Sequence, residues 1–142
     1  MQQHLNIVTI LVEDLHQALA FYRDGLGWQP WWPTTEPPAG TTAEIDHAAF
    51  DLGQGLSLVL YPGAKRPQAG SQPVVELAQF VDTKAEVDTV LQQATAAGAT
   101  VIAPAAAQEW GGYTAKFADL DGCCWEITWN PHYATDSKGE GK

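Results

Sequence analysis

The chain repeats one pattern of elements after about 68 residues. In each half, an apolar run typical of a strand comes before a segment with helical spacing, and further strand-like runs follow. The first copy begins at Ile7 and the second at Glu76. Self-similarity over this length usually reports a duplicated structural unit. The repeat therefore predicts two modules, each with the order β-α-β-β-β.

Hydrophobic periodicity and turn residues place the expected elements. The expected helices end at glycines: Gly25 and Gly27 in the first half and Gly98 in the second. The first strand is apolar on both faces, which predicts a strand buried on both sides. The predicted strands are residues 4–12, 28–32, 44–52, 56–61, 74–81, a strand from residue 100, 113–118 and 123–129, and the predicted helices are 15–26 and 85–97.

With so few strands per helix, the order predicts an α+β fold in which one helix covers the outer face of each sheet. Two curved sheets side by side would leave a cleft between their open faces. We expect a single domain of two modules, 1–62 and 74–133, joined by a glycine- and proline-rich linker at 63–73. The polar segment 134–142 is expected to be a flexible tail, and residues 33–42 are expected to form a loop.

Charge and composition exclude some classes of function. The net charge of −10 argues against nucleic acid, which needs a basic surface. It is compatible with attraction of a cationic small molecule, or simply with a soluble acidic surface. No apolar run reaches the ~20 residues of a membrane span, and no secretory signal is recognisable, so a cytoplasmic location is expected. Cys123 and Cys124 would point to opposite faces of a strand, so we expect them to stay reduced and unpaired.

Three segments carry a resemblance to a known family. They are Val12-Glu-Asp-Leu15 with Phe21-Tyr22 and Leu26-Gly27, then Trp110-Gly-Gly, and then Phe117-x-Asp-x-Asp-Gly122-x-x-x-Glu126. Together they resemble the vicinal oxygen chelate superfamily, which includes glyoxalase I, extradiol dioxygenases and bleomycin-resistance proteins. The resemblance implies paired βαβββ modules that form an open, barrel-like cleft. It also implies a homodimer, because a lone pair of modules leaves sheet edges and one side of the cleft open.

The resemblance further implies a divalent metal held by His or Glu from the first and the late strand of each module. In this sequence, those four positions are Ile7, Val59 (Leu58 if the register slips by one), Glu76 and Glu126. Two of the four are apolar, so the usual metal site is absent. No cofactor is expected, and the alternative is a noncanonical divalent-metal site formed by His47, Glu76 and Glu126.

The two glutamates are also candidate catalytic residues without a metal. Glu76 shares its strand face with Ala78 and Phe80, which predicts a half-apolar setting, a raised pKa and a role as general base. It could equally anchor a positively charged ligand group. Glu126 could instead be solvated or hydrogen-bonded to the backbone, without a functional role.

The aromatic residues suggest what a ligand would contact. Trp125 alternates out of phase with Glu126 and is expected in the core. Four other tryptophans border loops and turns, where they suit stacking on a flat or cationic ligand or, alternatively, a dimer interface. The candidate ligand-binding residues are Trp28, Trp31, Trp32, His47, Phe80, Trp110, Tyr113 and Cys124.

The first functional hypothesis is a small-molecule-binding protein of the glyoxalase/bleomycin-resistance type, without the usual metal, that sequesters a cationic aromatic compound. The alternative is a metal-dependent lyase, isomerase or dioxygenase of the same superfamily with a noncanonical site, or an enzyme that uses Glu76 as base. A third hypothesis gives Trp31 and Trp32 to a protein–protein contact.

Overall fold

The computed structural model describes residues 1–32, 45–68 and 70–133. The chain divides into two compact units, Met1–Ala69 and Gly70–Lys142, and the division falls inside the segment 63–73 that was predicted as a linker. The predicted loop at 33–42 and the predicted tail at 134–142 lie outside the described residues. Within the described part of the chain, no helix has the length and apolar character needed to cross a membrane.

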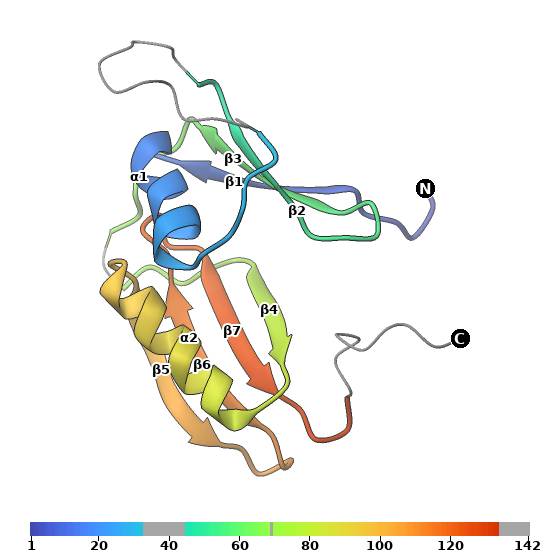
Figure 1. Cartoon of the computed structure of the whole chain (residues 1–142). Coiled ribbons are helices and arrows are strands. Elements are labelled where there is room, and N and C mark those ends of the chain that lie inside the picture. Colours follow the sequence, from blue (N-terminus) through green and yellow to red (C-terminus); the bar gives the residue numbers. More distant parts are fainter. Residues whose placement is uncertain (33–44, 69, 134–142) are drawn as a thin grey trace. The chain divides into compact units, whose positions relative to one another are not determined.

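The first unit is a three-stranded sheet with helical turns against one face (Figure 1). The strand order is β1-β3-β2, with β1 parallel and β2 antiparallel to the central β3. Its elements are β1 (Ile7–Val12), α1 (Leu15–Ala20), a π-helical segment η1 (Phe21–Gly25), β2 (Ala48–Asp51) and β3 (Ser57–Pro62). The helix predicted at 15–26 is therefore α1 followed by η1.

Aromatic side chains build the core between η1 and the sheet. Phe21 and Tyr22 are adjacent in sequence and both buried, and their rings meet edge to face at 5.1 Å. The Tyr22 ring also lies 5.9 Å from Phe50 of β2 and 5.5 Å from Trp28. A π-turn widens the helix locally. We attribute the turn to these two neighbouring rings, which both face the core.

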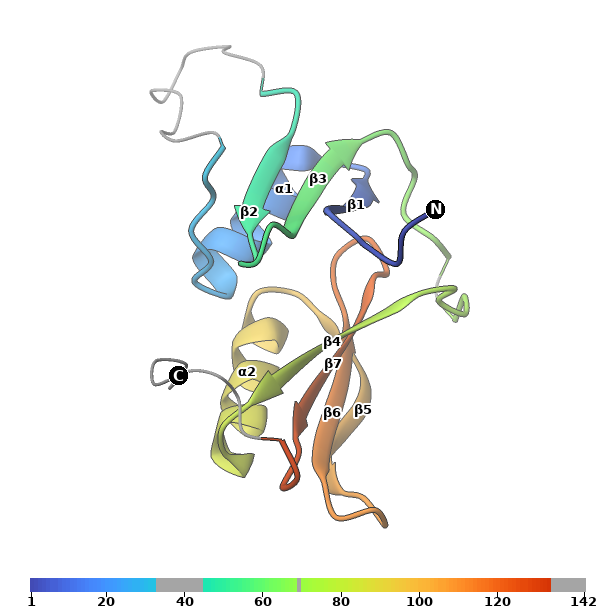
Figure 2. The same ribbon diagram turned by 90° about the vertical axis from the view of Figure 1, so that its right-hand side faces the viewer.

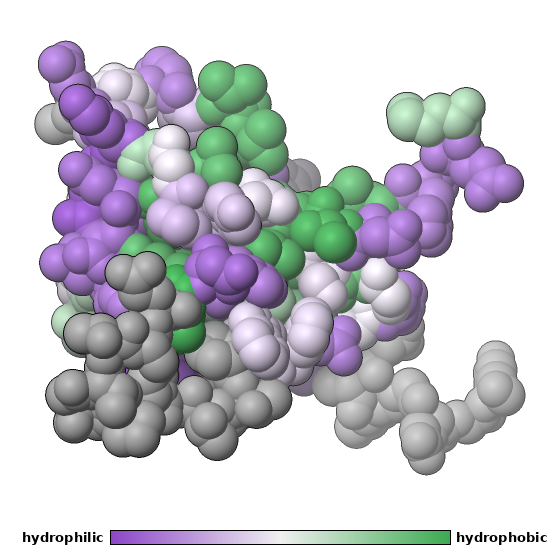
Figure 3. All heavy atoms as spheres, turned by 90° about the horizontal axis from the view of Figure 1, so that it is seen from above, coloured by the Kyte–Doolittle hydropathy of each residue, from purple (hydrophilic) through white to green (hydrophobic). Residues whose placement is uncertain are grey.

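Two expectations for the first unit are wrong. Residues 28–32 do not form a strand, because only Trp32 makes a β-bridge, to Ala49. The first strand is not buried on both faces: Ile7 is 56% and Leu11 53% exposed, and hydrophobic residues are visible on the surface in Figure 3. The helical layer covers one face of this small sheet and leaves the side chains of the other face accessible.

The second unit is a four-stranded sheet with one helix on one face (Figure 2). The strand order is β4-β7-β6-β5, in which β4 runs parallel to β7 and the other neighbours are antiparallel. Its elements are β4 (Glu76–Val81), α2 (Lys84–Ala96), β5 (Thr100–Ala107), β6 (Tyr113–Ala118) and β7 (Cys124–Trp129). Two units of this kind confirm the predicted α+β class.

Helix α2 begins at a complete capping box. Thr83 accepts a hydrogen bond from the Glu86 backbone N–H, and the Glu86 carboxylate accepts one from the Thr83 N–H. The helix covers the sheet face that carries Trp129, since the Lys84 ammonium lies 5.0 Å from the centre of that ring. Trp125 shares this face by strand alternation and is buried, which confirms it as a core residue. The other face of the sheet carries the polar side chains.

Candidate functional site

The sheet face opposite α2 is organised in rows by the pairing of its strands. Glu76 of β4 pairs with Cys124 of β7, and Ala78 of β4 pairs with Glu126. On the other side of β7, Glu126 pairs with Lys116 of β6. Because side chains two positions apart point to the same face, all of these residues share the face away from α2. We call Glu76, Lys116, Cys124 and Glu126 the polar cluster.

Lys116 holds the polar cluster together. Its Nζ donates hydrogen bonds to Oε1 and Oε2 of Glu76 at 3.2 and 3.0 Å. The same Nζ lies 3.7 Å from Oε2 of Glu126. The lysine starts on β6 and reaches across β7 to the glutamate of β4, so three strands contribute to one ionic contact. Its side chain is 30% exposed, against 45% for Glu76 and 31% for Glu126, and the cluster is therefore accessible to a ligand.

The ammonium sets the protonation of its partner. The hydrogen bond from Lys116 lowers the pKa of the Glu76 carboxyl below its ordinary value of 4.5. The predicted raised pKa of Glu76 is therefore wrong, because a cation and solvent surround this carboxylate instead of an apolar pocket. The same hydrogen bond raises the pKa of Lys116. Both groups are charged at neutral pH, which leaves Glu76 a weak general base.

The remaining members of the cluster are fixed by short contacts. The Thr128 hydroxyl donates to Oε1 of Glu126 at 2.8 Å, and the Glu126 side chain is 31% exposed. The Cys124 thiol is buried and donates to Oε1 of Glu76 at 3.6 Å. Burial raises the pKa of the Cys124 thiol, which therefore stays protonated at neutral pH.

An aromatic pair lies on the same face, one row beyond Glu126. Phe80 pairs with Thr128 in the β4–β7 register, and its ring lies 5.2 Å from the ring of Tyr133. Phe80 is 44% and Tyr133 63% exposed. We call these two residues the aromatic pair. Next to the polar cluster, it forms an exposed aromatic surface.

Trp110 lies in the turn between β5 and β6. Its indole is half exposed and packs over Gly112, so closely that a Cβ at Gly112 would collide with the ring. The turn precedes β6, whose first residue, Tyr113, pairs with Trp129. Trp129 follows Thr128, the register partner of Phe80, along β7. Trp110 and the aromatic pair therefore belong to the same end of the second sheet.

The structure places other predicted site residues elsewhere. Tyr113 faces α2, where its hydroxyl donates to Asp88 at 2.8 Å, so it does not join the polar cluster. Trp28 packs in the aromatic core of the first unit, against Tyr22 and Phe50. Neither side chain belongs to the open face of the second sheet.

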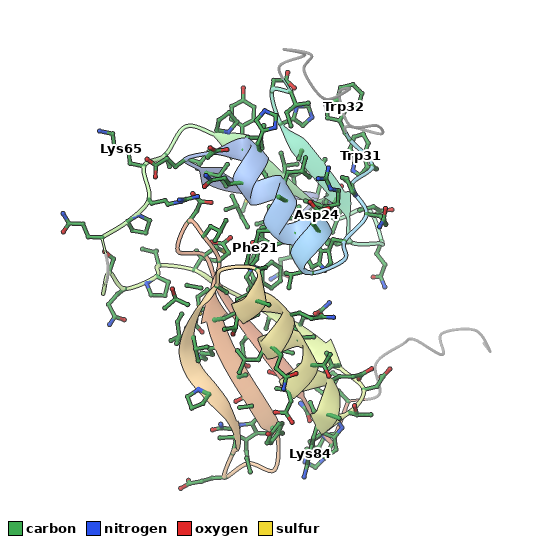
Figure 4. The ribbon with its side chains drawn as sticks, turned by 60° about the vertical axis from the view of Figure 1, so that its left-hand side comes forward. Phe21, Asp24, Trp31, Trp32, Lys65 and Lys84 are labelled. Carbon is green, nitrogen blue, oxygen red and sulfur yellow. The ribbon has the colours of Figure 1, made fainter. Side chains whose placement is uncertain are left out.

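Trp31, Trp32 and His47 also belong to the first unit. Trp31 and Trp32 extend from the chain beside the first sheet (Figure 4) and are half exposed. The ring of Trp32 stacks on His47 at 6.1 Å. Nδ1 of His47 lies 2.7 Å from the carboxylate of Asp46.

Strand register also identifies the corresponding positions of the first sheet. Thr9 pairs with Val59 as Ala78 pairs with Glu126. Val59, and not Leu58, is therefore the counterpart of Glu126, and Ile7 is the counterpart of Glu76. Leu58 is buried on the helix side of its sheet. The first copy of the repeat thus presents apolar side chains where the second presents carboxylates.

A divalent metal does not fit the second sheet. Among the residues that the structure describes, no group of three or more His, Cys, Asp or Glu side chains could hold a metal ion. Here the two carboxylates already share an ammonium, and the nearby Cys124 thiol is protonated, whereas a metal binds the thiolate. The two carboxylates of the second sheet are therefore already partly neutralised by Lys116.

Sequence reasoning missed Lys116 and Tyr133. A signal for Lys116 exists: the turn at Asp119–Gly122 joins two antiparallel strands, and counting outward from it pairs residue 116 with residue 126. Tyr133 follows the last strand after a short turn, and no pattern in the sequence marks it as a partner of Phe80.

Comparison with known proteins places this geometry in a family. The model of the Glyoxalase/Bleomycin resistance protein/Dioxygenase superfamily matches residues 4–127. This match spans both sheets and both carboxylates of the polar cluster. No functionally curated protein is similar enough in sequence to match the chain.

Solved structures share the fold over nearly the whole chain. A glyoxalase-related enzyme from Fulvimarina pelagi is 25% identical with a TM-score of 0.75, and the match covers 98% of this chain and 96% of that one. A family enzyme from Burkholderia phytofirmans PsJN is 21% identical with a TM-score of 0.66, over 87% and 95%. The fosfomycin resistance protein FosX from Mesorhizobium loti is 17% identical with a TM-score of 0.66, over 93% and 96%.

Proposed function

The chain belongs to the Glyoxalase/Bleomycin resistance protein/Dioxygenase superfamily, and on that premise we propose that it binds a cationic aromatic small molecule without the help of a metal. Binding would sequester the compound and leave it chemically unchanged. The observation that carries the proposal is the pair of features on one sheet face: an accessible carboxylate, Glu126, one row away from the exposed aromatic pair Phe80 and Tyr133.

Charge supports a cationic ligand group. Two carboxylates and one ammonium leave the polar cluster with a formal charge of −1. Both hydrogen bonds from Lys116 go to Glu76, whereas Glu126 lies 3.7 Å from the ammonium. Glu126 is thus the less fully neutralised carboxylate and the one we assign to the ligand. The chain's net charge of −10 adds a long-range attraction for cations.

The aromatic side chains support a flat ligand. Phe80 and Tyr133 are exposed beside the polar cluster, and cations bind favourably over aromatic faces in such settings. Exposed aromatic surface is unfavourably hydrated. A ligand that covers it removes apolar surface from water, which contributes to the free energy of binding. Trp110, at the same end of the sheet, provides further apolar surface and a fluorescent reporter.

Ethidium, a planar aromatic cation, is a suitable probe for this site. We expect the full chain to bind it with one site, followed by fluorescence anisotropy. Glu126→Gln should weaken binding about tenfold, or roughly 1.4 kcal/mol, because it removes the charge that faces the ligand. Phe80→Ala and Trp110→Ala should weaken binding while leaving the far-UV circular dichroism spectrum unchanged.

Asp24→Asn is the matched control for charge. It removes one exposed carboxylate from η1 in the first unit, so it lowers the net negative charge by the same amount as Glu126→Gln. It should bind ethidium as the wild type does. If Glu126→Gln and Asp24→Asn have the same affinity as the wild type, the polar cluster is not the binding site.

A further inference from the structure

The polar cluster gathers two carboxylates around one positive charge. Glu76 and Glu126 lie on the adjacent strands β4 and β7 and point to the same face. Without a cation between them, the two carboxylates would repel each other. The Lys116 Nζ lies 3.0 Å from Oε2 of Glu76 and 3.7 Å from Oε2 of Glu126, so it supplies that cation.

A divalent metal would compete for the same place. Hard cations such as Mg²⁺ and Ca²⁺ bind carboxylate oxygens at about 2.0–2.6 Å, and an ion shared by Glu76 and Glu126 would have to lie where the ammonium lies. The lysine also stays charged, because its hydrogen bond to Glu76 raises its pKa. The Lys116 side chain extends from β6 across β7 to Glu76 of β4, whereas an ordinary cross-strand ion pair joins two adjacent strands.

We infer that Lys116 acts as a built-in cation that occupies the position of a divalent metal and keeps such metals off the carboxylates of the second sheet. This inference concerns cation occupancy alone and holds whatever small molecule the protein binds. It accounts for two glutamates that remain together on one face without a third acidic, histidine or thiolate donor among the described residues.

The test removes the ammonium and asks whether a metal takes its place. Lys116→Gln and Lys116→Met both delete the positive charge, and the methionine variant retains an apolar stem over β7. We expect each variant to bind one Mn²⁺ per chain at least about tenfold more tightly than the wild type, since two carboxylates are then free to act as ligands. Titration calorimetry and the electron paramagnetic resonance signal of free Mn²⁺ report binding without reference to activity.

Lys84→Gln is the matched control. It removes the same charge from the second unit, but Lys84 lies over Trp129 on the α2 face, away from the polar cluster. Its Mn²⁺ affinity should equal that of the wild type. Glu126→Gln in the Lys116→Gln background should abolish the gain. Circular dichroism confirms that each variant is folded.

Two results would overturn the inference. One is a wild-type protein that already binds one Mn²⁺ as tightly as the Lys116 variants do. The other is a folded pair of Lys116 variants whose Mn²⁺ affinity equals that of Lys84→Gln. Because the readout is Mn²⁺, either result leaves the ethidium experiment to be judged by its own outcome.

Discussion

At the scale of single residues, the ion pair of Glu76 and Lys116 makes stability depend on pH. The pKa of Glu76 is lower in the folded chain than its ordinary value of 4.5, so folding favours the charged carboxylate. The resulting stabilisation is present above pH 4.5 and is lost as the pH falls through the lower, folded pKa. The pH dependence that Lys116 contributes has the opposite sign. Because its pKa is raised in the folded chain, it stabilises the fold below its ordinary pKa of 10.5, and this stabilisation is lost as the pH rises and the lysine deprotonates.

Urea unfolding at several pH values checks this prediction. Between pH 6 and 8, Glu76→Gln should have a lower unfolding midpoint than the wild type, and the two midpoints should converge as the pH falls well below 4.5. Glu109→Gln, an exposed change in the turn between β5 and β6, should keep the wild-type pH profile. A constant difference between Glu76→Gln and wild type across the acid range would contradict the assigned ion pair.

The same residues show what sequence reasoning could and could not reach. The position of Glu76 and Glu126 on one face was implied by the family resemblance, which places both at ligand positions, and the strand register agrees with it. The setting of Glu76 did not, because it was inferred from Ala78 and Phe80 on its own strand, whereas its decisive partner Lys116 is 40 residues away. Such a contact depends on the register of three strands and on the reach of a flexible side chain.

At the scale of elements, the cap of α2 is the clearest determinant of a boundary. The predicted helix at 85–97 begins one residue earlier in the structure, at Lys84, because Thr83 and Glu86 form the capping box. The strand predicted at 113–118 is β6 with the same bounds. Residues 28–32 were predicted to be a strand because aromatic residues favour strands. A strand also needs a continuous series of backbone hydrogen bonds to a neighbouring strand. Within these residues only Trp32 makes a β-bridge, to Ala49.

Thr83→Ala should destabilise the second unit by about 1 kcal/mol, because it leaves a backbone N–H at the start of α2 without its acceptor. Urea unfolding followed by circular dichroism measures the loss. Thr89→Ala is the control: the same change in the middle of α2 removes an exposed hydroxyl bonded to the Ala85 carbonyl and should alter stability by less than about 0.5 kcal/mol. Equal losses in both variants would show that the cap contributes nothing of its own.

At the scale of the whole molecule, the repeat was the most informative feature. It predicted two modules, and the structure has two units that divide at the predicted linker. The two copies then diverged in chemistry. The open face of the second sheet carries the polar cluster, whereas the equivalent positions of the first sheet, Ile7 and Val59, are apolar. Among the described residues, the first copy forms three strands and the second four, and the carboxylates at these equivalent positions occur in the second copy.

The apolar face of the first sheet predicts self-association. Leu11 pairs with Tyr61 in the β1–β3 register, and both are half exposed on the face opposite α1, as is Ile7. Exposed apolar side chains gathered on one face often mark an interface, and β1 is in addition an edge strand of the sheet that the described residues form. A second copy of the chain would bury both features, so we expect a homodimer.

Sedimentation velocity of the full chain tests this expectation. The wild type should sediment as a dimer at micromolar concentration, and Leu11→Glu should shift it to monomer, because the dimer would have to bury a carboxylate without a partner. Leu52→Glu places the same charge on an exposed leucine at the turn between β2 and β3 and should leave the dimer intact. A monomeric wild type, or a Leu11→Glu variant that remains dimeric, would assign the apolar face of the first sheet a different role.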